Sequence, residues 1–374
     1  MQQPTFSRLL GLDCLRALAI SLVVLSHITF LLYPNTTSTL IDFVRIMGAI
    51  GVDLFFVLSG YLIGGILLKI LKEEHLQWSS LIRFWKRRWL RTLPNYFLVL
   101  ILNVVGALIV GTSLPKDVFL YSFFFQNFAS EHPDFFTEAW SLSIEEFAYL
   151  LLPFFLFLSV MLFKKGNRQL LFFRTTLLII IMLTIFKIFY YFDNSITTYH
   201  EWSTSFRKVV IYRMDSIYYG FIVLFLVKNF PNFITRKKNI LLILGLASFA
   251  LLHIFVYVFN LLPQSHFGFY VFIYLQIVGI SLALLFPYFL NLKRTFFGQQ
   301  LIEFISKRSY AIYLVNYSLV LLNIELLFDI YSMNILEKTA LVILFLLMTT
   351  VISNIMYVYF ENPILKFRDR KFPR

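Results

Sequence analysis

Long runs of apolar residues alternate with short polar connections along the whole chain. A run of about 20 apolar residues is typical of a helix that crosses a lipid bilayer. The pattern predicts ten such helices, at about 12–33, 48–70, 93–112, 140–163, 171–192, 209–229, 239–260, 267–290, 309–330 and 338–360. The sequence therefore predicts an all-α, polytopic integral membrane protein with a single transmembrane domain over residues 1–374.

The basic residues gather at alternate ends of the predicted helices. Three of the 33 Lys and Arg residues lie in the interior of the predicted spans, namely Arg16, Lys187 and Arg213, and those among the first or last four residues of a span are counted with the adjoining connection. The connections on one side contain only Arg45, Lys116, Arg207, Lys208 and Lys338, and all the others lie on the side of the N-terminus. Because basic residues concentrate in cytoplasmic loops, we predict that both termini are cytoplasmic and that the protein lies in the inner (cytoplasmic) membrane. The net charge of +13 is explained in this way, and no nucleic-acid partner is predicted.

Four segments stand out between and after the spans. Residues 71–92 mix Trp and Phe with cations, which is typical of an amphipathic helix at the cytoplasmic interface. On the opposite side, residues 113–139 and 193–208 contain many aromatic side chains. These either stack on the face of a sugar or form an aromatic belt at the membrane interface. Residues 361–374 form a basic tail that is predicted to be cytoplasmic.

Composition narrows the class of protein. The chain is 59% hydrophobic and 14% charged, against about 25% charged residues in soluble domains, which excludes a soluble multidomain protein. A single cysteine, Cys14, excludes an internal disulfide and argues against a structural zinc cluster. The first apolar run lacks a following small-residue cleavage site, so we expect it to be retained as a helix. The sequence shows no internal repeat, Walker loop, dinucleotide fingerprint or H-E-x-x-H, and no metal or permanently bound cofactor is predicted.

The first apolar run, RALAISLVVLSH, is bracketed by Arg16 and His27. Their offset corresponds to about three helical turns, roughly 16 Å, and places both side chains on one face. An ionisable group within a span costs several kcal/mol unless it faces a cavity or a partner. Snorkelling to headgroups would explain Arg16 alone, and a helix–helix hydrogen bond would explain His27 alone. Their shared face favours a polar cavity.

Further polar residues interrupt the next spans. Asp53 stands near the start of the second span, where it is either a helix cap or a cavity residue. Glu145 and Glu146 open the fourth span about 100° apart, so we assign Glu146 to helix capping and Glu145 to a site. Arg88 and Arg91 are three residues apart on one face, which suits a phosphate-rich ligand as well as the positive-inside rule.

Two later spans add candidates for the lining of a cavity. Arg213 and Asp215 lie on different faces of the sixth span, so we expect them to pair with other helices or to flank a polar cavity. In the ninth span, Tyr310, Tyr313 and Asn316 recur every three residues along one face.

The ordered set of motifs resembles the acyltransferase-3 family of bacterial membrane O-acyltransferases over nearly the whole chain. The motifs are GLDCLRALAISLVVLSH, GVDLFFVLSGYLI, RRWLRTLPNY, WSLSIEE with Tyr149, YRMDSIYYG, SYAIYL and a closing ENP at Glu361–Pro363. Two positions depart from the family pattern. Asn316 replaces a histidine found in many members, and Glu-Phe-Ala replaces the usual Glu-Gln-Phe after Glu145. We expect a standalone member without a fused hydrolase-like domain.

The resemblance implies a ten-helix fold and an acyl-CoA donor, usually acetyl-CoA, that enters from the cytoplasm. It implies a hydroxyl acceptor on a carbohydrate, such as a lipid-linked or cell-surface glycan, or on a small secreted metabolite. Within this pattern His27 is the catalytic residue, Glu145 is a site carboxylate, and Arg16, Arg88 and Arg91 face coenzyme A.

These residues suggest a mechanism. Imidazole is the side chain suited to act as a general base near neutral pH. We therefore predict that His27 deprotonates the acceptor hydroxyl, with Glu145 orienting its ring or stabilising its charged form. An acyl-histidine intermediate is an open alternative. A transporter or flippase for a glycan or its lipid carrier is the alternative from another class.

Overall fold

A computed structural model describes residues 9–36, 38–73, 77–163, 166–292 and 297–373. Ten helical segments in these ranges are long and apolar enough to cross a membrane, which confirms the predicted number of spans. No β-strand occurs among the described residues. The elements are α1 (Leu10–Leu32), α2 (Thr39–Leu71), α3 (Trp78–Val110), η1 (Val118–Phe123), α4 (Ala139–Leu162), α5 (Arg168–Asp193), α6 (Tyr199–Trp202), η2 (Ser203–Arg207), α7 (Val210–Arg213), α8 (Asp215–Asn229), α9 (Pro231–Val258), α10 (Phe267–Phe269), η3 (Tyr270–Tyr274), α11 (Leu275–Ala283), α12 (Phe286–Leu290), α13 (Gln299–Val315), η4 (Asn316–Leu321), α14 (Leu322–Leu327), α15 (Ile335–Ile355), η5 (Met356–Glu361) and α16 (Asn362–Lys371).

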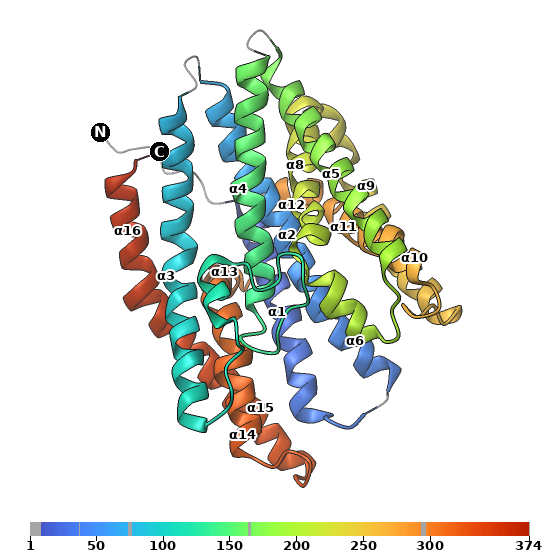
Figure 1. Cartoon of the computed structure of the whole chain (residues 1–374), viewed down its shortest axis with the longest axis vertical. Helices are drawn as coiled ribbons and strands as arrows, with labels where there is room; N and C mark the ends of the chain where they lie inside the picture. The colour runs from blue at the N-terminus through green and yellow to red at the C-terminus, as the bar shows by residue number, and fades with distance from the viewer. Residues whose placement is uncertain (1–8, 37, 74–76, 164–165, 293–296, 374) are drawn as a thin grey trace.

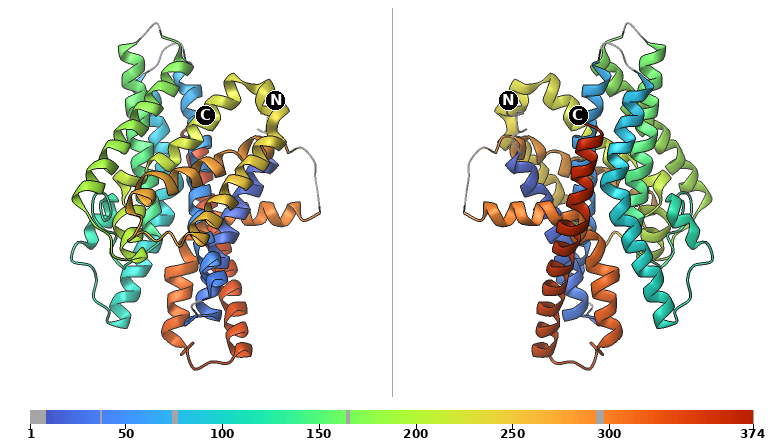
Figure 2. Two further views of the ribbon diagram at one scale, coloured as in Figure 1. Left: turned by 90° about the vertical axis from the view of Figure 1, so that its right-hand side faces the viewer. Right: turned by 90° about the vertical axis from the view of Figure 1, so that its left-hand side faces the viewer.

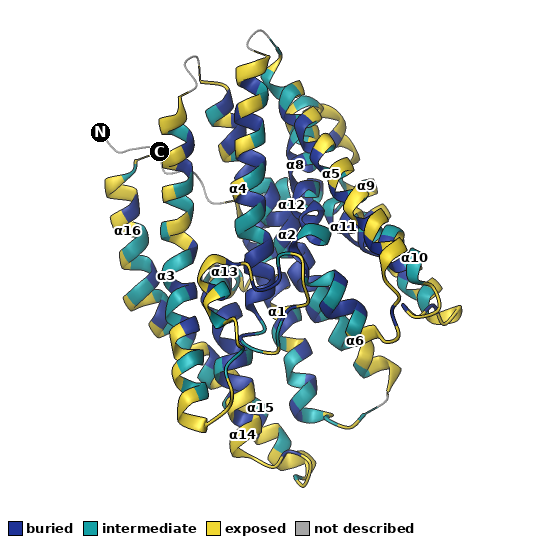
Figure 3. Cartoon of the chain, in the orientation of Figure 1, coloured by how far each residue is buried: buried dark blue, intermediate teal, exposed yellow. Residues whose placement is uncertain are grey.

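Most of the long helices run side by side along the long axis of the molecule, and α1 and α2 lie among the others (Figure 1). Helix α2 packs against α1 on one side and α8 on another, and α1 also contacts α13. Figure 2 shows the orange and red helices of the last third of the chain standing beside the blue first helices. Colouring by burial places the buried residues at the centre, whereas α9 and the ends of the bundle are largely exposed (Figure 3). Between them, the first two helices also contact α4, α5, α11, α12 and α15, so they lie in the interior of the bundle.

Two helices are longer than the sequence predicted. An interfacial helix was expected over residues 71–92, of which 74–76 lie outside the described residues, but residues 78–92 continue without a break into the third span as α3. The reason is packing, because Leu81 and Phe84 are buried and the Trp85 indole donates a 2.9 Å hydrogen bond to the carbonyl of Tyr149 on α4. Likewise, the last span continues through η5 into α16 and ends at Lys371, so the basic tail is helical. Helix α16 packs against α3.

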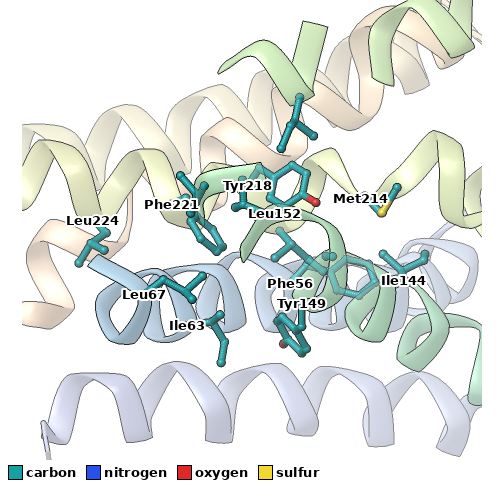
Figure 4. Packing of buried hydrophobic residues seen from close by; sticks show 14 of the residues in the cluster. Phe56, Ile63, Leu67, Ile144, Tyr149, Leu152, Met214, Tyr218, Phe221 and Leu224 are labelled. Atoms are coloured by element: carbon teal, nitrogen blue, oxygen red, sulfur yellow. The ribbon is translucent and has the colours of Figure 1, made fainter. Parts of the chain in front are cut away.

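The largest core cluster joins α2, α4 and α8. Figure 4 shows side chains of this cluster from these helices, among them Phe56, Ile63, Tyr149 and Phe221. In a bilayer the apolar surfaces of helices are not driven together by water, so close packing and small residues decide which helices touch. The contact between α2 and α8 is of this kind.

Gly60 of α2 and Gly220 of α8 allow the two backbones to approach each other. A β-carbon built on Gly60 would lie 1.8 Å from the carbonyl oxygen of Ile217, and one on Gly220 would lie 2.1 Å from the carbonyl oxygen of Val57. Both oxygens belong to the backbone and cannot move aside. The two helices can therefore cross this closely only because neither position carries a side chain.

We predict that Gly60→Ala destabilises the folded protein by at least about 1–3 kcal/mol, because the two helices must separate to admit the methyl group. The measurement is thermal unfolding in detergent, with the yield of monodisperse protein as a second readout. Gly106→Ala on α3 is the control, since nothing lies within 4 Å of its β-carbon. That variant is expected to be neutral or stabilised by up to ~1 kcal/mol. Equal melting of both variants would contradict the prediction.

Candidate active site

A cavity of about 660 Å³ opens between α1, α2, α3, α4, α8, α13 and α16. Among the described residues, eight basic side chains line it, namely Arg16, Lys69, Arg83, Arg87, Arg88, Arg91, Lys228 and Arg368, together with two acidic ones, Glu73 and Glu145. Apolar side chains of α2, including Phe55 and Leu62, line another part of its wall. The cavity therefore combines a strongly cationic region with an apolar surface, which suits a ligand that has phosphates at one end and an uncharged arm at the other.

Arg88 and Glu145 form the polar centre of the cavity wall. The Nη2 of Arg88 donates to Oε2 of Glu145 at 3.0 Å, and the Arg88 guanidinium lies 4.1 Å from the ring centroid of Tyr149. The Tyr149 hydroxyl donates to the same Oε2 at 2.8 Å, and the Ser59 hydroxyl donates to Oε1 at 3.1 Å. Three helices thus fix one carboxylate, and its negative charge is already compensated by Arg88.

The other predicted cationic residues converge on the same cavity. Arg16 lines it from α1 and lies 3.7 Å from the Asp13 carboxylate. Arg91 lines it from α3, one turn beyond Arg88, and no ion pair within 4 Å joins it to an acid among the described residues. Arg87 and Arg368 share the carboxylate of Asp369 at 2.8 Å each. The structure therefore brings together the three cations that the sequence assigned to a phosphate-rich ligand.

His27 lies outside this cavity lining and has a different partner from the one expected. Its Nδ1 is hydrogen-bonded to Oδ1 of Asn316, and its ring centroid lies 4.8 Å from that of Tyr317. We expected His27 to contact Glu145. The hydrogen bonds of the Glu145 carboxylate come instead from Ser59, Arg88 and Tyr149. Sequence spacing could not reveal this, because Asn316 is 289 positions from His27.

Asn316 fixes the protonation pattern of the imidazole. Its Nδ2 donates to the carbonyl oxygens of Ile312 and Tyr313, each at 2.8 Å, so Oδ1 is the atom that faces His27. An amide oxygen only accepts, and therefore Nδ1 of a neutral His27 carries the hydrogen. The lone pair is then on Nε2, for which no hydrogen bond is found among the described residues. The residue that replaces the family's histidine here orients His27.

Tyr310 and Tyr313 connect the cavity with the surroundings of His27. Both line the cavity, as predicted, whereas Asn316, the third residue of the predicted face, does not. The Tyr310 hydroxyl donates to the carbonyl of Thr92 at 2.8 Å, and the Tyr313 and Ser141 hydroxyls are hydrogen-bonded at 2.7 Å. Asn316 follows Tyr313 by one helical turn, a rise of about 5 Å. The inner end of the cavity thus lies one turn from the residue that holds the imidazole.

Asp53, Arg213 and Asp215 form buried ion pairs away from the cavity. Arg213 pairs with Asp53 of α2, and Lys187 of α5 pairs with Asp215. The expectation that Arg213 and Asp215 pair with other helices is confirmed. The capping interpretation of Asp53 is wrong, because α2 begins at Thr39 and Asp53 lies in its interior. None of these residues lines the cavity.

Some residues of the site escaped the sequence analysis. Ser59 lies in a quoted motif, and its only signal is a hydroxyl within an apolar run. Glu146 was assigned to helix capping, but its carboxylate accepts a 2.7 Å hydrogen bond from the Thr92 hydroxyl on α3. An acid in the first turns of a helix is expected both for helix capping and for a hydrogen bond to a neighbouring helix, so the sequence alone does not separate these two roles.

Comparison with known proteins gives the family. The model of the acyltransferase-3 family, described as an acyltransferase domain, matches residues 9–358. O-acetyltransferase OatA of Staphylococcus aureus is 28% identical over 382 residues, which cover 95% of this chain and 57% of the relative. This chain thus spans a little over half the length of that protein.

Two further relatives match a shorter stretch. Peptidoglycan O-acetyltransferase OatA of Listeria monocytogenes is 33% identical over 161 residues, covering 39% of this chain and 24% of the relative. A putative peptidoglycan O-acetyltransferase, YrhL of Bacillus subtilis, is 33% identical over 176 residues, covering 42% of this chain and 25% of the relative. No solved structure matches the chain. The family model covers nearly the whole sequence, and the chain therefore belongs to the acyltransferase-3 family, as its ordered motifs predicted.

Proposed function

We propose that this protein is a membrane-embedded O-acyltransferase that moves an acyl group, preferentially acetyl, from acyl-CoA to a hydroxyl of a glycan. The observation that carries the proposal is the cationic cavity whose inner end lies one helical turn from the partner of His27. Relatives named as peptidoglycan O-acetyltransferases support a glycan acceptor. The whole chain, residues 1–374, acts as one transmembrane domain in this proposal.

The proposal that acyl-CoA is the donor is based on the positive charge of the cavity. Coenzyme A carries several phosphate groups on a long uncharged pantetheine arm. Arg16, Arg88 and Arg91 line the cavity from two helices and offer guanidinium donors, which bind phosphate oxygens through paired hydrogen bonds. The arm would then extend along the apolar wall of α2 and carry the thioester toward Tyr313. The concentration of basic residues around the cavity supports a cytoplasmic position for its mouth, on the side where acyl-CoA is available.

The chemical step rests on the orientation of His27. With its hydrogen on Nδ1, the ring offers Nε2 as the base. Nε2 takes the proton of the acceptor hydroxyl, whose oxygen attacks the thioester carbon. The carbon–sulfur bond then breaks, and the proton passes from the imidazolium to the departing thiolate of coenzyme A. Glu145, already compensated by Arg88, orders the cavity wall and takes no part in this proton transfer.

The proposal is tested with radiolabelled acetyl-CoA and purified protein in lipid nanodiscs, with soluble peptidoglycan fragments as the acceptor. An acyltransferase consumes the thioester and releases labelled, esterified glycan. An intact thioester under all conditions would instead point to the transporter interpretation. Label on a small alcohol but never on a glycan would point to a metabolite acceptor.

Arg91→Ala is expected to raise the KM for acyl-CoA by about 10- to 100-fold, since a hydrogen bond to a charged group contributes about 1.5–3 kcal/mol. The kcat at saturating donor should change much less, because Arg91 does not contact the reacting atoms. Steady-state kinetics with varied acetyl-CoA measure both constants.

Arg174→Ala is the matched control for this variant. Arg174 is an exposed arginine of α5 on the same predicted cytoplasmic side, and it does not line the cavity. It should leave the KM for acyl-CoA unchanged. If Arg91→Ala and Arg174→Ala reduced only the amount of inserted protein, both to a similar degree, Arg91 would serve topology alone.

A further inference from the structure

Glu138 is a buried acid outside the cavity lining. It directly precedes α4, is 4% exposed, and stands at the end of the long connection from α3. Its Oε1 accepts a 2.8 Å hydrogen bond from the backbone N–H of Ser318, a residue 180 positions away. Its own backbone carbonyl accepts a 3.2 Å hydrogen bond from the Tyr313 hydroxyl. One residue therefore contacts the ninth span at two points.

These two points flank Asn316. Tyr313 precedes Asn316 by one turn, and Ser318 follows it by two residues. The turn between them is also where α13 ends and the π-helical segment η4 begins. A π-helical turn inside a longer helix is uncommon and is often found at functional sites, where it re-aims a side chain. Here the first residue of the π-helical segment is Asn316, whose amide is hydrogen-bonded to His27.

We propose that Glu138 is a positioning residue that holds η4 in register, so that the Asn316 amide orients the imidazole of His27. The chain of contacts runs from the Glu138 carboxylate to the Ser318 backbone, from that turn to Asn316, and from Asn316 to Nδ1 of His27. The second anchor, from the Tyr313 hydroxyl to the Glu138 carbonyl, fixes the other end of the turn. The consequence for catalysis rests on the proposed role of His27 as the base.

In this arrangement Glu138 acts through the oxygen that accepts the hydrogen bond from Ser318, and a negative charge on the carboxylate is not required. No cation is found within ion-pair distance of the carboxylate among the described residues, and its Oε2 is buried without a hydrogen-bond partner. Burial raises the pKa of Glu138, which precedes the membrane-spanning part of α4, to about 7. A neutral side chain with a carbonyl oxygen in the same place should therefore serve equally well.

The test compares Glu138→Gln with Glu138→Ala and Glu138→Asp in the full-length protein. The Gln variant keeps an acceptor for the Ser318 N–H and should retain kcat within about twofold. The Ala variant removes the acceptor, and the Asp variant shortens it, so both should lower kcat at least about tenfold. The KM for acyl-CoA should stay within about twofold in all three, because Glu138 does not line the donor cavity. Glu131→Ala changes an exposed acid of the same connection and serves as the control.

A second readout does not depend on activity. The rate at which diethyl pyrocarbonate modifies His27, followed by mass spectrometry of its peptide, reports on the exposure and tautomer of the ring. It should change at least about threefold in Glu138→Ala or Glu138→Asp and stay at the wild-type rate in Glu138→Gln. The Asp variant serves if the Ala variant does not fold.

The outcomes separate the two proposals. Unchanged His27 modification in both the Ala and Asp variants overturns the positioning role. A kcat loss in Glu138→Gln equal to that in Glu138→Ala overturns it also, because charge would then be what matters. If His27→Ala kept full activity while Glu138→Ala still altered His27 modification, the positioning role would stand and the proposed catalytic role of His27 would fail.

Discussion

His27→Ala is expected to abolish measurable acyl transfer, with kcat reduced by about 10²- to 10⁴-fold. This is the range that a positioned general base contributes. The fold should survive, because the imidazole is only half-buried and its hydrogen bond to Asn316 is the one side-chain hydrogen bond found for it among the described residues. The measurement is release of coenzyme A and of labelled acetyl-glycan by the nanodisc-embedded variant at saturating acetyl-CoA.

His253→Ala is the matched control for this prediction. His253 of α9 is another half-buried histidine of a membrane-spanning helix, and it too is hydrogen-bonded through Nδ1, to the carbonyl of Phe249 at 2.8 Å. It lies outside the cavity lining, so its loss should leave kcat unchanged. Full turnover by His27→Ala would remove the imidazole from the chemistry, however well the family pattern fits.

Asp53→Ala is expected to have the largest effect on stability, a loss of about 3–5 kcal/mol in the free energy of unfolding. Arg213 is 1% exposed and Asp53 is 3% exposed. Removing the carboxylate therefore leaves the guanidinium charge of Arg213 without its acidic partner in the interior of the bundle. Breaking a buried pair costs far more than the pair contributes, because the remaining charge lies in a medium of low dielectric constant. Thermal unfolding in detergent and the fraction of monodisperse protein measure the loss.

Asp42→Ala provides the comparison on the same helix. Asp42 also pairs with an arginine, Arg45 at 3.4 Å, but its side chain is 55% exposed, so that pair contributes at most about 1 kcal/mol. Replacing both interior partners, as in D53L with R213M, should restore most of the stability, because no buried charge is then left unpaired. Similar melting of Asp53→Ala and Asp42→Ala would show that the interior pair is not needed for folding.

The helices were predictable because the bilayer imposes their length and apolarity. Ten spans could be located from hydropathy alone, and the predicted set agrees with the structure in number. The extension of α3 over residues 78–92 could not be predicted in this way. A segment that mixes basic and aromatic side chains is equally typical of a separate helix at the membrane interface. Contact with Tyr149 on another helix decided the outcome.

The part of the candidate site that lies on one face of a single helix was predictable from the sequence. Arg88 and Arg91, three residues apart, had to point the same way, and both line the cavity with Arg16. Pairings between distant helices were not predictable. Spacing within one span cannot indicate that Asn316 rather than Glu145 binds His27, or that Lys187 is the partner of Asp215. The catalytic roles of His27 and Glu145, and the cytoplasmic position of the termini, stay predictions.

The hydrogen bond between the Tyr313 and Ser141 hydroxyls has a consequence for the cell as well as for the reaction. Both residues line the cavity and His27 does not, so this hydrogen bond lies between the cavity and the surroundings of the imidazole. In the proposed function, the bond would keep the two sides of the membrane separate while the charged donor occupies the cavity, so that the electrochemical gradient across the membrane is preserved.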